Sequence, residues 1–562
     1  MTVRQIDGGL RTTVDVLRHA AGANPAVEAF VEPATGTSGR RAITFSGWDR
    51  AADGVAGLFA GVGVGPGTVV GLLVTASIDY AVCYAAAMRL GAVTSGINPR
   101  LGAAEVRSII DRTAPVVCVV EDGGGPGGGG PDGGGLGPAG TVLTRSEVRA
   151  AFDGPPPPSC ASLSPDDPVA VVWTSGTTGL PKGAVFDHQN LAAVAAGSDV
   201  LSVPGDRRLS PLPFAHVGYM TRPWDEMANG ITTVITPSPW RAEDTIRIIG
   251  DERITVAQGV PTQWALVLDH PRAAQLDASS LRIVGTGASR VPPELVRRLL
   301  ARLGAPVVVR YTSTEASLGT GTVPGDDDTT VATTVGRPVT GVELRIVSDA
   351  GEVQPAGGTG RVHLRSGAVM RGYWGGPLTG PGPAGVVYDR DATAAVLAPD
   401  GWLTTGDYGS VGDDGNLRLA GRANELYIRG GYNVFPAEVE AVLAGHRAVE
   451  QVAVVGVPDP VLGEIGVAFV VLDGDGGDGG DGGDGGDGGD GGDGGDGGDG
   501  GALLADLRRL ASASLADYKA PDRLVVVDGL PVTPMMKIDR RALRRRWEQL
   551  AAGDPDRERS NA

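Results

Sequence analysis

The sequence predicts an α/β protein of at least two domains, in which parallel strands alternate with helices and a more β-rich part follows. The chain has 562 residues, which is too long for one hydrophobic core. Before Val342, short β-branched runs alternate with helical stretches, a pattern that is typical of parallel sheets. From Val342 onward, short strands separated by Gly and Asp turns predominate instead.

The individual elements follow from these runs in chain order. Each expected strand is a short apolar stretch bounded by polar or turn residues. In the α/β part the strands are Thr68–Val74, Val116–Val120, Val169–Trp173, Thr232–Ile235, Ile283–Gly285 and Val307–Val309, with a helix at Glu294–Leu303. Later strands are expected at Glu343–Ile346, Gly360–Arg365, Asn416–Leu419 and Ile465–Leu472, with a helix at Leu503–Leu515.

Two glycine-rich inserts interrupt this pattern. Gly123–Gly140 is almost entirely Gly and Pro, and Asp473–Gly501 repeats Gly-Gly-Asp. Neither offers enough apolar surface to offset the entropy of ordering, so both are expected to be flexible, disordered loops. A calcium-binding β-roll is disfavoured for the second insert, because the repeat lacks the large apolar residue that packs such a roll.

The charge distribution argues against a nucleic-acid partner. The formal net charge is −18, and ten aspartates lie in the tract from Asp473 to Asp499, so 56 acidic and 48 basic residues, or −8, remain elsewhere. A mildly acidic chain is poorly suited to binding phosphate backbones. The most apolar stretch, Val69–Val93, is interrupted by Asp79 and Arg89, so no membrane span is expected.

The N-terminus and the cysteines indicate a cytoplasmic protein. Met1–Leu10 lacks the apolar core of a signal peptide. The three cysteines show no metal-ligand spacing, and a sparse, odd set fits a reduced compartment. The six histidines form no HxxxH or HxH pair, so no structural metal site is expected.

The segment from Thr174 to Gly183 (TSGTTGLPKG) carries the strongest functional signal. Glycines bring backbone N–H groups close to an anion, hydroxyls donate further hydrogen bonds and a lysine adds charge, which suits a triphosphate. The spacing differs from the common GxxxxGK[ST] loop, and the segment taken alone would also fit a solvated turn. The candidate phosphate-binding residues are Thr174, Ser175, Gly176, Thr177, Thr178, Gly179 and Lys182.

Six further strings follow this loop along the chain. They are PLPFAHVG (Pro211–Gly218), LRIVGTGAS (Leu281–Ser289), YTSTE (Tyr311–Glu315), GWLTTGD (Gly401–Asp407), the segment Gly421–Glu440 and LPVTPMMKID (Leu530–Asp539). Together with the Thr174–Gly183 loop, they resemble the signature of the adenylate-forming (AMP-binding) enzymes, which include acyl-CoA synthetases, peptide-synthetase adenylation domains and luciferases. The acyl-CoA synthetase or fatty-acid–CoA ligase branch is the one that we expect.

The resemblance implies where the nucleotide binds. The adenine would lie between the ring of Tyr311 and the backbone of the glycine turn, where small residues allow close approach. Asp407 would accept hydrogen bonds from the ribose hydroxyls, and Arg422 would contact ribose and phosphate. The remaining AMP-binding residues that the resemblance implies are Gly287, Ala288, Ser289, Thr312, Ser313 and Thr314.

The same resemblance implies the catalytic residues. Glu315 would hold Mg²⁺, which takes carboxylate and phosphate oxygens together. Lys537 would reach the adenylation site and bridge the attacking carboxylate and the α-phosphate, while Thr174 would contact the departing pyrophosphate. His216 would lie at the mouth of the acyl pocket, although a satisfied core histidine is the alternative.

The implied architecture has a large N-terminal adenylation domain, residues 1–424, and a small mobile α+β C-terminal domain, residues 425–562. Glu425 would be the hinge about which the small domain rotates, and Gly430 and Gly431 would line the tunnel for CoA. This chain departs from the family pattern at Thr312 (usually Gly), at Asn424 and at Met535-Met536 (usually Ser-Gly). A side chain at Thr312 would intrude near the acyl pocket, and the Met pair would stiffen the loop before Lys537.

The expected function is therefore an ATP-dependent ligase that adenylates a carboxylic acid and transfers the acyl group to CoA, with ATP, Mg²⁺ and CoA as cofactors. An adenylating enzyme with another acceptor stays open: a carrier-protein thiol, O₂, or an aryl amine that receives activated nitrite. A non-catalytic nucleotide-binding protein is disfavoured, because the expected catalytic positions are all occupied by suitable residues.

The sequence says less about which carboxylic acid is the substrate. The expected pocket walls, Val217–Trp224, Gln258–Trp264 and Thr312–Gly319, mix aromatic, small and polar residues and suit a cyclic or aromatic acid as well as a fatty chain. Arg222 would either pair with an anionic group or make a surface salt bridge, and the surface salt bridge is the expectation. The sequence makes no prediction of the oligomeric state.

Overall fold

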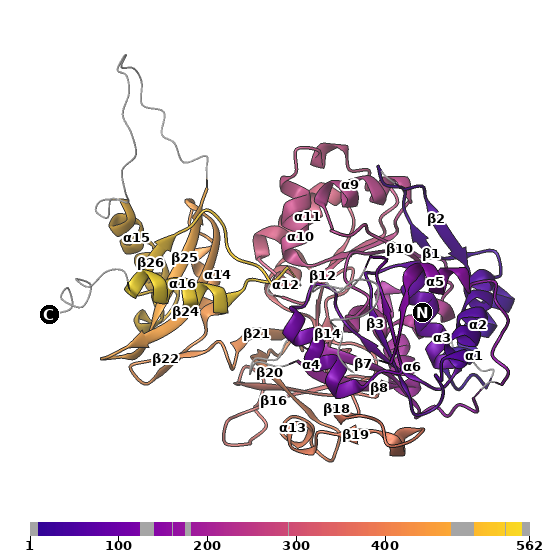
Figure 1. Ribbon diagram of the computed structural model, residues 1–562. Helices are drawn as coiled ribbons and strands as arrows, with labels where there is room; N and C mark the ends of the chain where they lie inside the picture. Colours follow the sequence, from indigo (N-terminus) through magenta and orange to yellow (C-terminus); the bar gives the residue numbers. More distant parts are fainter. Residues whose placement is uncertain are drawn as a thin grey trace. The chain divides into compact units, whose positions relative to one another are not determined.

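A computed structural model describes residues 9–36, 38–123, 140–159, 161–174, 181–289, 291–473, 499–533 and 536–552. The chain divides into two units (Figure 1): unit 1 is Met1–Thr405 with Ser410–Arg418, and unit 2 is Gly406–Gly409 with Leu419–Ala562. Most of the two predicted inserts, at 124–139 and 474–498, lies outside the described residues.

The first large sheet of unit 1 has eight strands in the order β19-β18-β8-β7-β4-β3-β5-β6. Its β7, β4, β3, β5 and β6 pair in parallel, while β8, β18 and β19 add an antiparallel edge. Helices cover both faces of a parallel sheet, so strands that bury both faces are apolar along their whole length. The bounds are β3 (Val69–Leu73), β4 (Val93–Gly96), β5 (Val117–Val120), β6 (Thr141–Thr144), β7 (Pro168–Thr174), β8 (Lys182–Asp187), β18 (Gly372–Gly376) and β19 (Val387–Tyr388).

The second large sheet of unit 1 has nine strands in the order β15-β14-β13-β12-β11-β9-β10-β1-β2. From β13 to β1 the neighbours are parallel, so their carboxyl ends lie at one edge of the sheet. The bounds are β1 (Glu28–Glu32), β2 (Arg41–Thr44), β9 (Arg207–Ser210), β10 (Thr232–Ile235), β11 (Val256–Gly259), β12 (Ile283–Gly287), β13 (Val307–Tyr311), β14 (Thr320–Gly321) and β15 (Arg337–Pro338).

Amphipathic helices pack against these sheets. Helix α11 buries Leu295, Val296, Leu299 and Leu303 on one face and ends at Gly304, whose φ of +63° favours glycine. The helices of unit 1 are α1 (Thr13–Ala23), α2 (Phe45–Gly61), α3 (Ile78–Arg89), α4 (Ala103–Thr113), α5 (Arg145–Ala150), α6 (His188–Ala196), α7 (Val217–Met220), α8 (Pro223–Ala228), α9 (Ala242–Asp251), α10 (Pro261–Asp269), α11 (Pro293–Leu303), α12 (Asp328–Thr333) and α13 (Arg390–Ala394).

A four-stranded sheet forms the β-rich part that the sequence predicts after Val342. Its order is β16 (Glu343–Val347), β17 (Thr359–Arg365), β20 (Leu403–Val411) and β21 (Leu417–Arg422). Along β20 and β21 the chain passes from unit 1 into unit 2.

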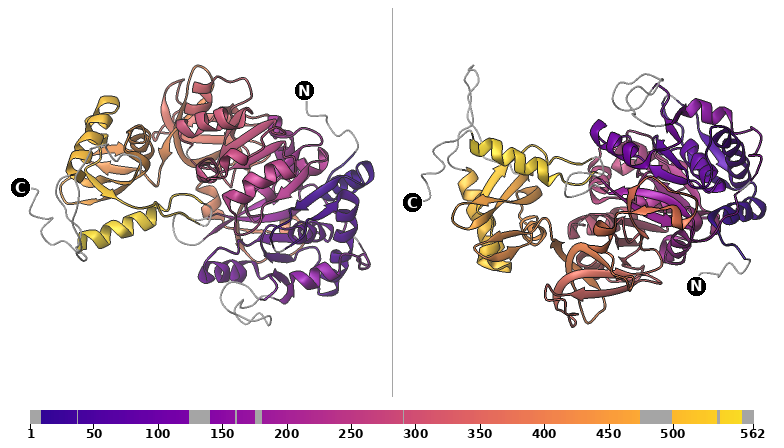
Figure 2. Two further views of the ribbon diagram at one scale, coloured as in Figure 1. Left: turned by 90° about the horizontal axis from the view of Figure 1, so that it is seen from above. Right: turned by 60° about the horizontal axis from the view of Figure 1, so that its bottom comes forward.

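Unit 2 is a sheet with helices on both faces. Its strands are β23 (Tyr432–Val434), β22 (Tyr427–Arg429), β25 (Gly463–Leu472), β24 (Val449–Asp459) and β26 (Arg523–Val526). Alternate residues of β24 point to opposite faces: Val452 and Val454 pack with Leu507 of α15, while Ala453 and Val455 pack with Leu543 of α16. Figure 2 shows α15 and α16 on the two sides of this sheet. The helices are α14 (Pro436–Leu443), α15 (Asp499–Ser514) and α16 (Arg540–Ala552).

These sheets confirm the predicted α/β class, the β-rich part after Val342 and the separate α+β region at the C-terminus. Each predicted strand lies within two residues of an observed one at either end, except Asn416–Leu419, whose counterpart β21 continues to Arg422. Across the described residues, no helix combines the length and the apolar character that crossing a membrane requires.

Candidate active site

The predicted phosphate loop joins two neighbouring antiparallel strands. Strand β7 ends at Thr174 and β8 begins at Lys182, and these two residues face each other in register. Both are half-buried. Ser175, Gly176, Thr177, Thr178 and Gly179 lie outside the described residues. The strands therefore hold the two ends of the loop at one point of the sheet.

Three side chains follow one another at the Lys182 end of this loop: Lys182, Tyr373 and Glu315. The Lys182 Nζ lies 5.2 Å from the centre of the Tyr373 ring, and the Tyr373 hydroxyl donates a hydrogen bond to Glu315 Oε1 at 2.6 Å. Burial and the nearby Glu315 carboxylate raise the pKa of the Tyr373 phenol, so it keeps its proton and remains a donor. Tyr373 belongs to none of the sequence strings, and only the pairing of β18 with β8 brings it here.

The predicted adenine site lies where β12 and β13 end side by side. Gly287 is opposite Arg310 in the parallel register, and a Cβ at Gly287 would collide with the Arg310 carbonyl oxygen. Ala288, with a φ of +63°, and Ser289 are exposed at this edge. Tyr311 is 8% exposed, and its hydroxyl donates to Thr405 Oγ1 at 3.3 Å. The glycine turn at Gly287–Ser289 and the Tyr311 ring therefore lie at one edge of the same sheet.

The turn after Tyr311 is stabilised by its own hydroxyls. The Thr312 Oγ1 donates to the Ser313 carbonyl oxygen at 3.1 Å, and the Ala316 N–H donates to Ser313 Oγ at 3.2 Å. Thr312, Ser313, Thr314 and Glu315 are all half-buried. The Thr312 side chain is thus turned to its own backbone, and its predicted effect on the pocket stays a prediction.

His216 caps the start of α7. Its Nδ1 accepts a hydrogen bond from the Gly218 N–H at 3.2 Å, and the residue is half-buried. It is therefore not a fully buried core histidine, which was the alternative interpretation. The aromatic core lies just beside it, where the Phe214 and Tyr219 rings stack with centres 3.6 Å apart.

In unit 2, three predicted residues from distant strings form one charged cluster. Asp407 Oδ1 and Arg422 Nε form an ion pair at 3.2 Å, with the Asp407 side chain 10% exposed and that of Arg422 49% exposed. Burial, and then the Arg422 cation, lower the pKa of Lys537 to about 8, while Asp407 and Glu425 oppose this shift. Lys537 therefore lies within electrostatic reach of the residues that are predicted to hold the ribose.

The loop before Lys537 carries backbone strain. Met536 has a φ of +59°, a left-handed conformation that favours glycine. Glycine is the residue that the family resemblance leads us to expect there. The loop closes on itself, because the Thr533 N–H donates to the Lys537 carbonyl oxygen at 2.6 Å. Pro534 and Met535 lie outside the described residues.

The predicted hinge and CoA loop are both well defined within unit 2. Arg540 donates to Glu425 at 3.0 Å and to Glu440 at 2.5 and 3.0 Å. Gly430 (φ +57°) and Gly431 (φ +87°) form the turn between β22 and β23, a two-residue hairpin that requires positive φ at both positions. Their roles as hinge and CoA loop stay predictions.

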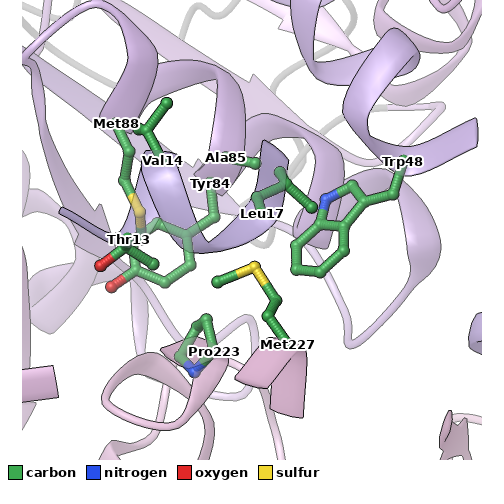
Figure 3. A pocket seen from close by; sticks show the side chains of 9 residues that line it. All are labelled: Thr13, Val14, Leu17, Trp48, Tyr84, Ala85, Met88, Pro223 and Met227. Carbon is green, nitrogen blue, oxygen red and sulfur yellow. The ribbon is translucent and has the colours of Figure 1, made fainter. Parts of the chain in front are cut away.

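A small pocket of unit 1 lies apart from these residues. Helices α1, α2, α3 and α8 enclose it, and apolar side chains such as Leu17, Trp48, Met88 and Met227 line it (Figure 3). Pro223, which belongs to the predicted wall Val217–Trp224, lines it, but none of the predicted catalytic or nucleotide-binding residues does. The pocket is therefore not part of the predicted nucleotide site.

A magnesium ion fits the site only as a partner of the nucleotide. Among the described residues, no group of three His, Cys, Asp or Glu side chains is placed to hold a metal. Glu315 is a single half-buried carboxylate that accepts a hydrogen bond from Tyr373, whose ring lies near Lys182. Mg²⁺ is commonly bound by one or two carboxylates together with substrate phosphates, which matches this donor set.

Known proteins match the chain over most of its length. The AMP-binding enzyme family model matches residues 17–374, and the model of the C-terminal domain of these enzymes matches residues 438–537. The chain is 42% identical to the 3-[(3aS,4S,7aS)-7a-methyl-1,5-dioxo-octahydro-1H-inden-4-yl]propanoyl:CoA ligase of Mycobacterium tuberculosis over 318 residues, which are 55% of this chain and 58% of that protein. It is 33% identical to the feruloyl-CoA synthase of an Amycolatopsis species, covering 91% of this chain and 95% of that protein.

A solved structure agrees with these sequence matches. The anthranilate CoA ligase AuaEII, in complex with anthranoyl-AMP, superimposes with a TM-score of 0.79 at 25% identity. The superposition covers 96% of this chain and 98% of that chain.

Proposed function

Because the chain belongs to the AMP-binding enzymes, we infer that it is an ATP-dependent acid–CoA ligase. An oxygen of the substrate carboxylate attacks the α-phosphorus of ATP, and pyrophosphate leaves. The CoA sulfur then attacks the carbonyl carbon of the acyl-adenylate, the thiol proton passes to solvent and AMP leaves. The observation that carries this inference is the charged cluster of Asp407, Arg422 and Lys537.

Unit 1 binds the triphosphate and the base. The Thr174–Lys182 loop holds the departing pyrophosphate, with Lys182 supplying positive charge. Tyr311 covers one face of the adenine, and the backbone of Gly287, Ala288 and Ser289 covers the other. Glu315, oriented by Tyr373, holds Mg²⁺, which neutralises phosphate charge when it is bound.

Unit 2 supplies the ribose contacts and the reacting cation. Asp407 accepts hydrogen bonds from the ribose hydroxyls, and Arg422 contacts ribose and phosphate. Lys537 places its ammonium between the attacking carboxylate and the α-phosphate, where negative charge develops in the transition state. A preorganised cation at that point is worth more than one that must move in from water.

The second half-reaction uses a different part of unit 2. Rotation of residues 425–562 about Glu425 withdraws Lys537 and presents the turn at Gly430 and Gly431 to the pantetheine of CoA. The domain limits, 1–424 and 425–562, follow from this hinge. His216 lies at the mouth of the acyl pocket, and the enzyme acts on a small-molecule carboxylic acid in the cytoplasm.

A panel of carboxylic acids, with nitrite included, tests the reaction. Pyrophosphate release is measured with ATP and Mg²⁺, with and without CoA, and the products are identified by mass. Thioesters that form only in the presence of CoA support the ligase. Pyrophosphate release without a thioester keeps the adenylation and moves the acceptor to a carrier-protein thiol, O₂ or an aryl amine. No release with any acid contradicts the proposal.

A further inference from the structure

Arg112 lies in the last turn of α4 and contacts both ends of the phosphate loop. Its Nη1 donates a hydrogen bond to the Pro181 carbonyl oxygen at 2.6 Å, and its Nη2 donates to the Trp374 carbonyl oxygen at 2.9 Å. Its guanidinium carbon lies 5.0 Å from the centre of the Trp173 ring. One side chain of α4 therefore joins β7, the residue before β8, and β18 (Figure 1).

Each of these three partners is the chain neighbour of a residue of the candidate site. The pairs are Trp173 with Thr174, Pro181 with Lys182, and Trp374 with Tyr373. Thr174 and Lys182 face each other at the two ends of the loop, and Tyr373 donates to Glu315. Because a peptide bond is planar, a fixed Pro181 carbonyl also fixes the direction of the Lys182 N–H.

The Trp173 ring is held by β4 and β8. Its Nε1 donates to Ser95 Oγ on β4 at 2.9 Å. On β8, Gly183 faces Trp173 in register, and a Cβ there would lie 2.6 Å from Val171 Cγ1 and 3.1 Å from two carbons of the Trp173 ring. The last glycine of the predicted loop string therefore leaves room for the ring that Arg112 contacts.

Arg112 and Trp374 bond to each other in both directions. The Trp374 Nε1 donates to the Arg112 carbonyl oxygen at 2.9 Å, and Trp374 is fully buried. Carbonyl groups in the last turn of a helix lack partners within that helix, so this bond satisfies one of them. The end of α4 is thus fixed to β18 by its backbone as well as by its side chain.

An arginine suits this position for a chemical reason. Its guanidinium is planar, its N–H donors point in fixed directions, and its face stacks on an aromatic ring. Burial lowers the pKa of Arg112, and the charge of Asp389 opposes this shift. Burying part of a cation costs free energy, which the bonds to two carbonyl oxygens offset. A methionine would fill the same space without orienting either carbonyl.

We propose that Arg112 is a positioning residue for the pyrophosphate part of the site. Its guanidinium fixes the two ends of the Thr174–Lys182 loop relative to the strand that carries Tyr373. The proposal rests on the ligase function inferred above, because it assigns Arg112 to the step in which pyrophosphate leaves or returns. Arg112 acts through Lys182 and Tyr373 and not by contact with the nucleotide.

The test compares two reactions of one acyl-adenylate, prepared from the best acid of the panel above. With pyrophosphate, an oxygen of pyrophosphate attacks the α-phosphorus, the carboxylate leaves and ATP forms again. With CoA, the thioester and AMP form. Arg112→Met should raise the KM for pyrophosphate, and the KM for ATP in the exchange reaction, by about tenfold, because a misplaced loop binds phosphates poorly. The rate with CoA should stay within about twofold of the wild type, since that reaction involves no pyrophosphate.

Two further variants separate positioning from charge and from folding. Arg112→Lys keeps the charge but loses the planar fork of donors, so it should restore the pyrophosphate reaction only in part. Full recovery in Arg112→Lys would show that a point charge suffices and would overturn the proposal. Arg107→Met, which removes an exposed arginine of the same helix, is the matched control and should equal the wild type in both reactions.

The failures are distinguishable. A folded Arg112→Met enzyme with an unchanged KM for ATP and pyrophosphate, or with equal losses in the pyrophosphate and CoA reactions, would overturn the positioning role and leave the ligase intact. A wild type that releases no pyrophosphate with any acid would overturn the ligase itself. If the melting temperature shows that Arg112→Met does not fold, Arg112→Lys and Arg112→Gln, which retain N–H donors without the fork, give the same decision.

Discussion

The two units hold their candidate site residues in different ways. In unit 1, candidate site residues lie near the ends of strands and have uncharged hydrogen-bond partners: the Tyr373 hydroxyl donates to Glu315, and the Tyr311 hydroxyl donates to Thr405. In unit 2 the corresponding residues are charges that act on one another, and Lys537 lies on a loop. Under the proposed function, unit 1 would provide a fixed surface for ATP, whereas the protonation of the unit 2 lysine depends on the charges around it.

Buried carboxylates of unit 1 are paired with arginines of the same unit. Asp79, 1% exposed, receives Arg41, Arg145 and Arg149 at 3.3, 2.8 and 2.6 Å, so the chain itself supplies both signs of charge. Asp225, 0% exposed, is likewise paired with Arg208 at 3.1 Å and with Arg222 at 4.0 Å.

The largest effect is expected from Lys537→Ala. Removing the cation should lower ATP–pyrophosphate exchange by about 10²–10³-fold, as for other groups that stabilise transition-state charge. Conversion of supplied acyl-adenylate and CoA to the thioester should be retained, because the lysine acts in the first half-reaction only. Equal loss of both half-reactions would contradict the division of labour between the two steps.

Glu315→Gln tests the fixed surface of unit 1. Glutamine keeps the shape and can still accept the hydrogen bond from Tyr373, but it lacks the charge that attracts Mg²⁺. We expect exchange to fall by about 10²-fold and to require more Mg²⁺. The measurement is a Mg²⁺ titration of the exchange rate.

Tyr373→Phe is the matched control for this substitution. It leaves the Glu315 charge in place and removes one hydrogen bond, which is worth about 1 kcal/mol, so a loss of roughly fivefold is expected. A variant Glu315→Gln with an unchanged Mg²⁺ requirement would rule out the metal role.

The pH dependence of ATP–pyrophosphate exchange tests whether the charge on Lys537 is required. Since the pKa of Lys537 is lowered to about 8, the lysine loses its proton as the pH rises through that value. Exchange at low ATP should then fall by about tenfold per pH unit above it. Lys537→Arg, whose guanidinium stays charged, should show no alkaline decline in this range. A wild-type profile that stays flat to pH 10 would contradict the assignment.

The smallest effect is expected from Met536→Gly. A φ of +59° at this position costs an L-residue about 1 kcal/mol, and glycine removes that cost. Part of the gain is offset because glycine gives the unfolded chain more conformational freedom. We expect the melting temperature to rise by about 2 °C at most. Met536→Ala retains the positive φ and should show no gain. A lower melting temperature for the glycine variant would show that the Met side chain stabilises the loop.

Much of this molecule could be predicted from local patterns. The strand before the phosphate loop and the helix at Glu294–Leu303 both appear where the sequence places them. Periodicity and turn residues are properties of neighbours in the chain, so they are visible without the fold. The family strings are local in the same sense.

The sequence by itself therefore determined the fold class, the family and the chemistry of the individual residues. Only the tertiary structure decided that Tyr373 orients Glu315, that Lys537 lies near Asp407 and Arg422, and that Arg222 is largely buried and pairs with Asp225. The physical reason is that the burial of a polar group and the charges that surround it depend on contacts between segments far apart in the chain. No local pattern records those contacts.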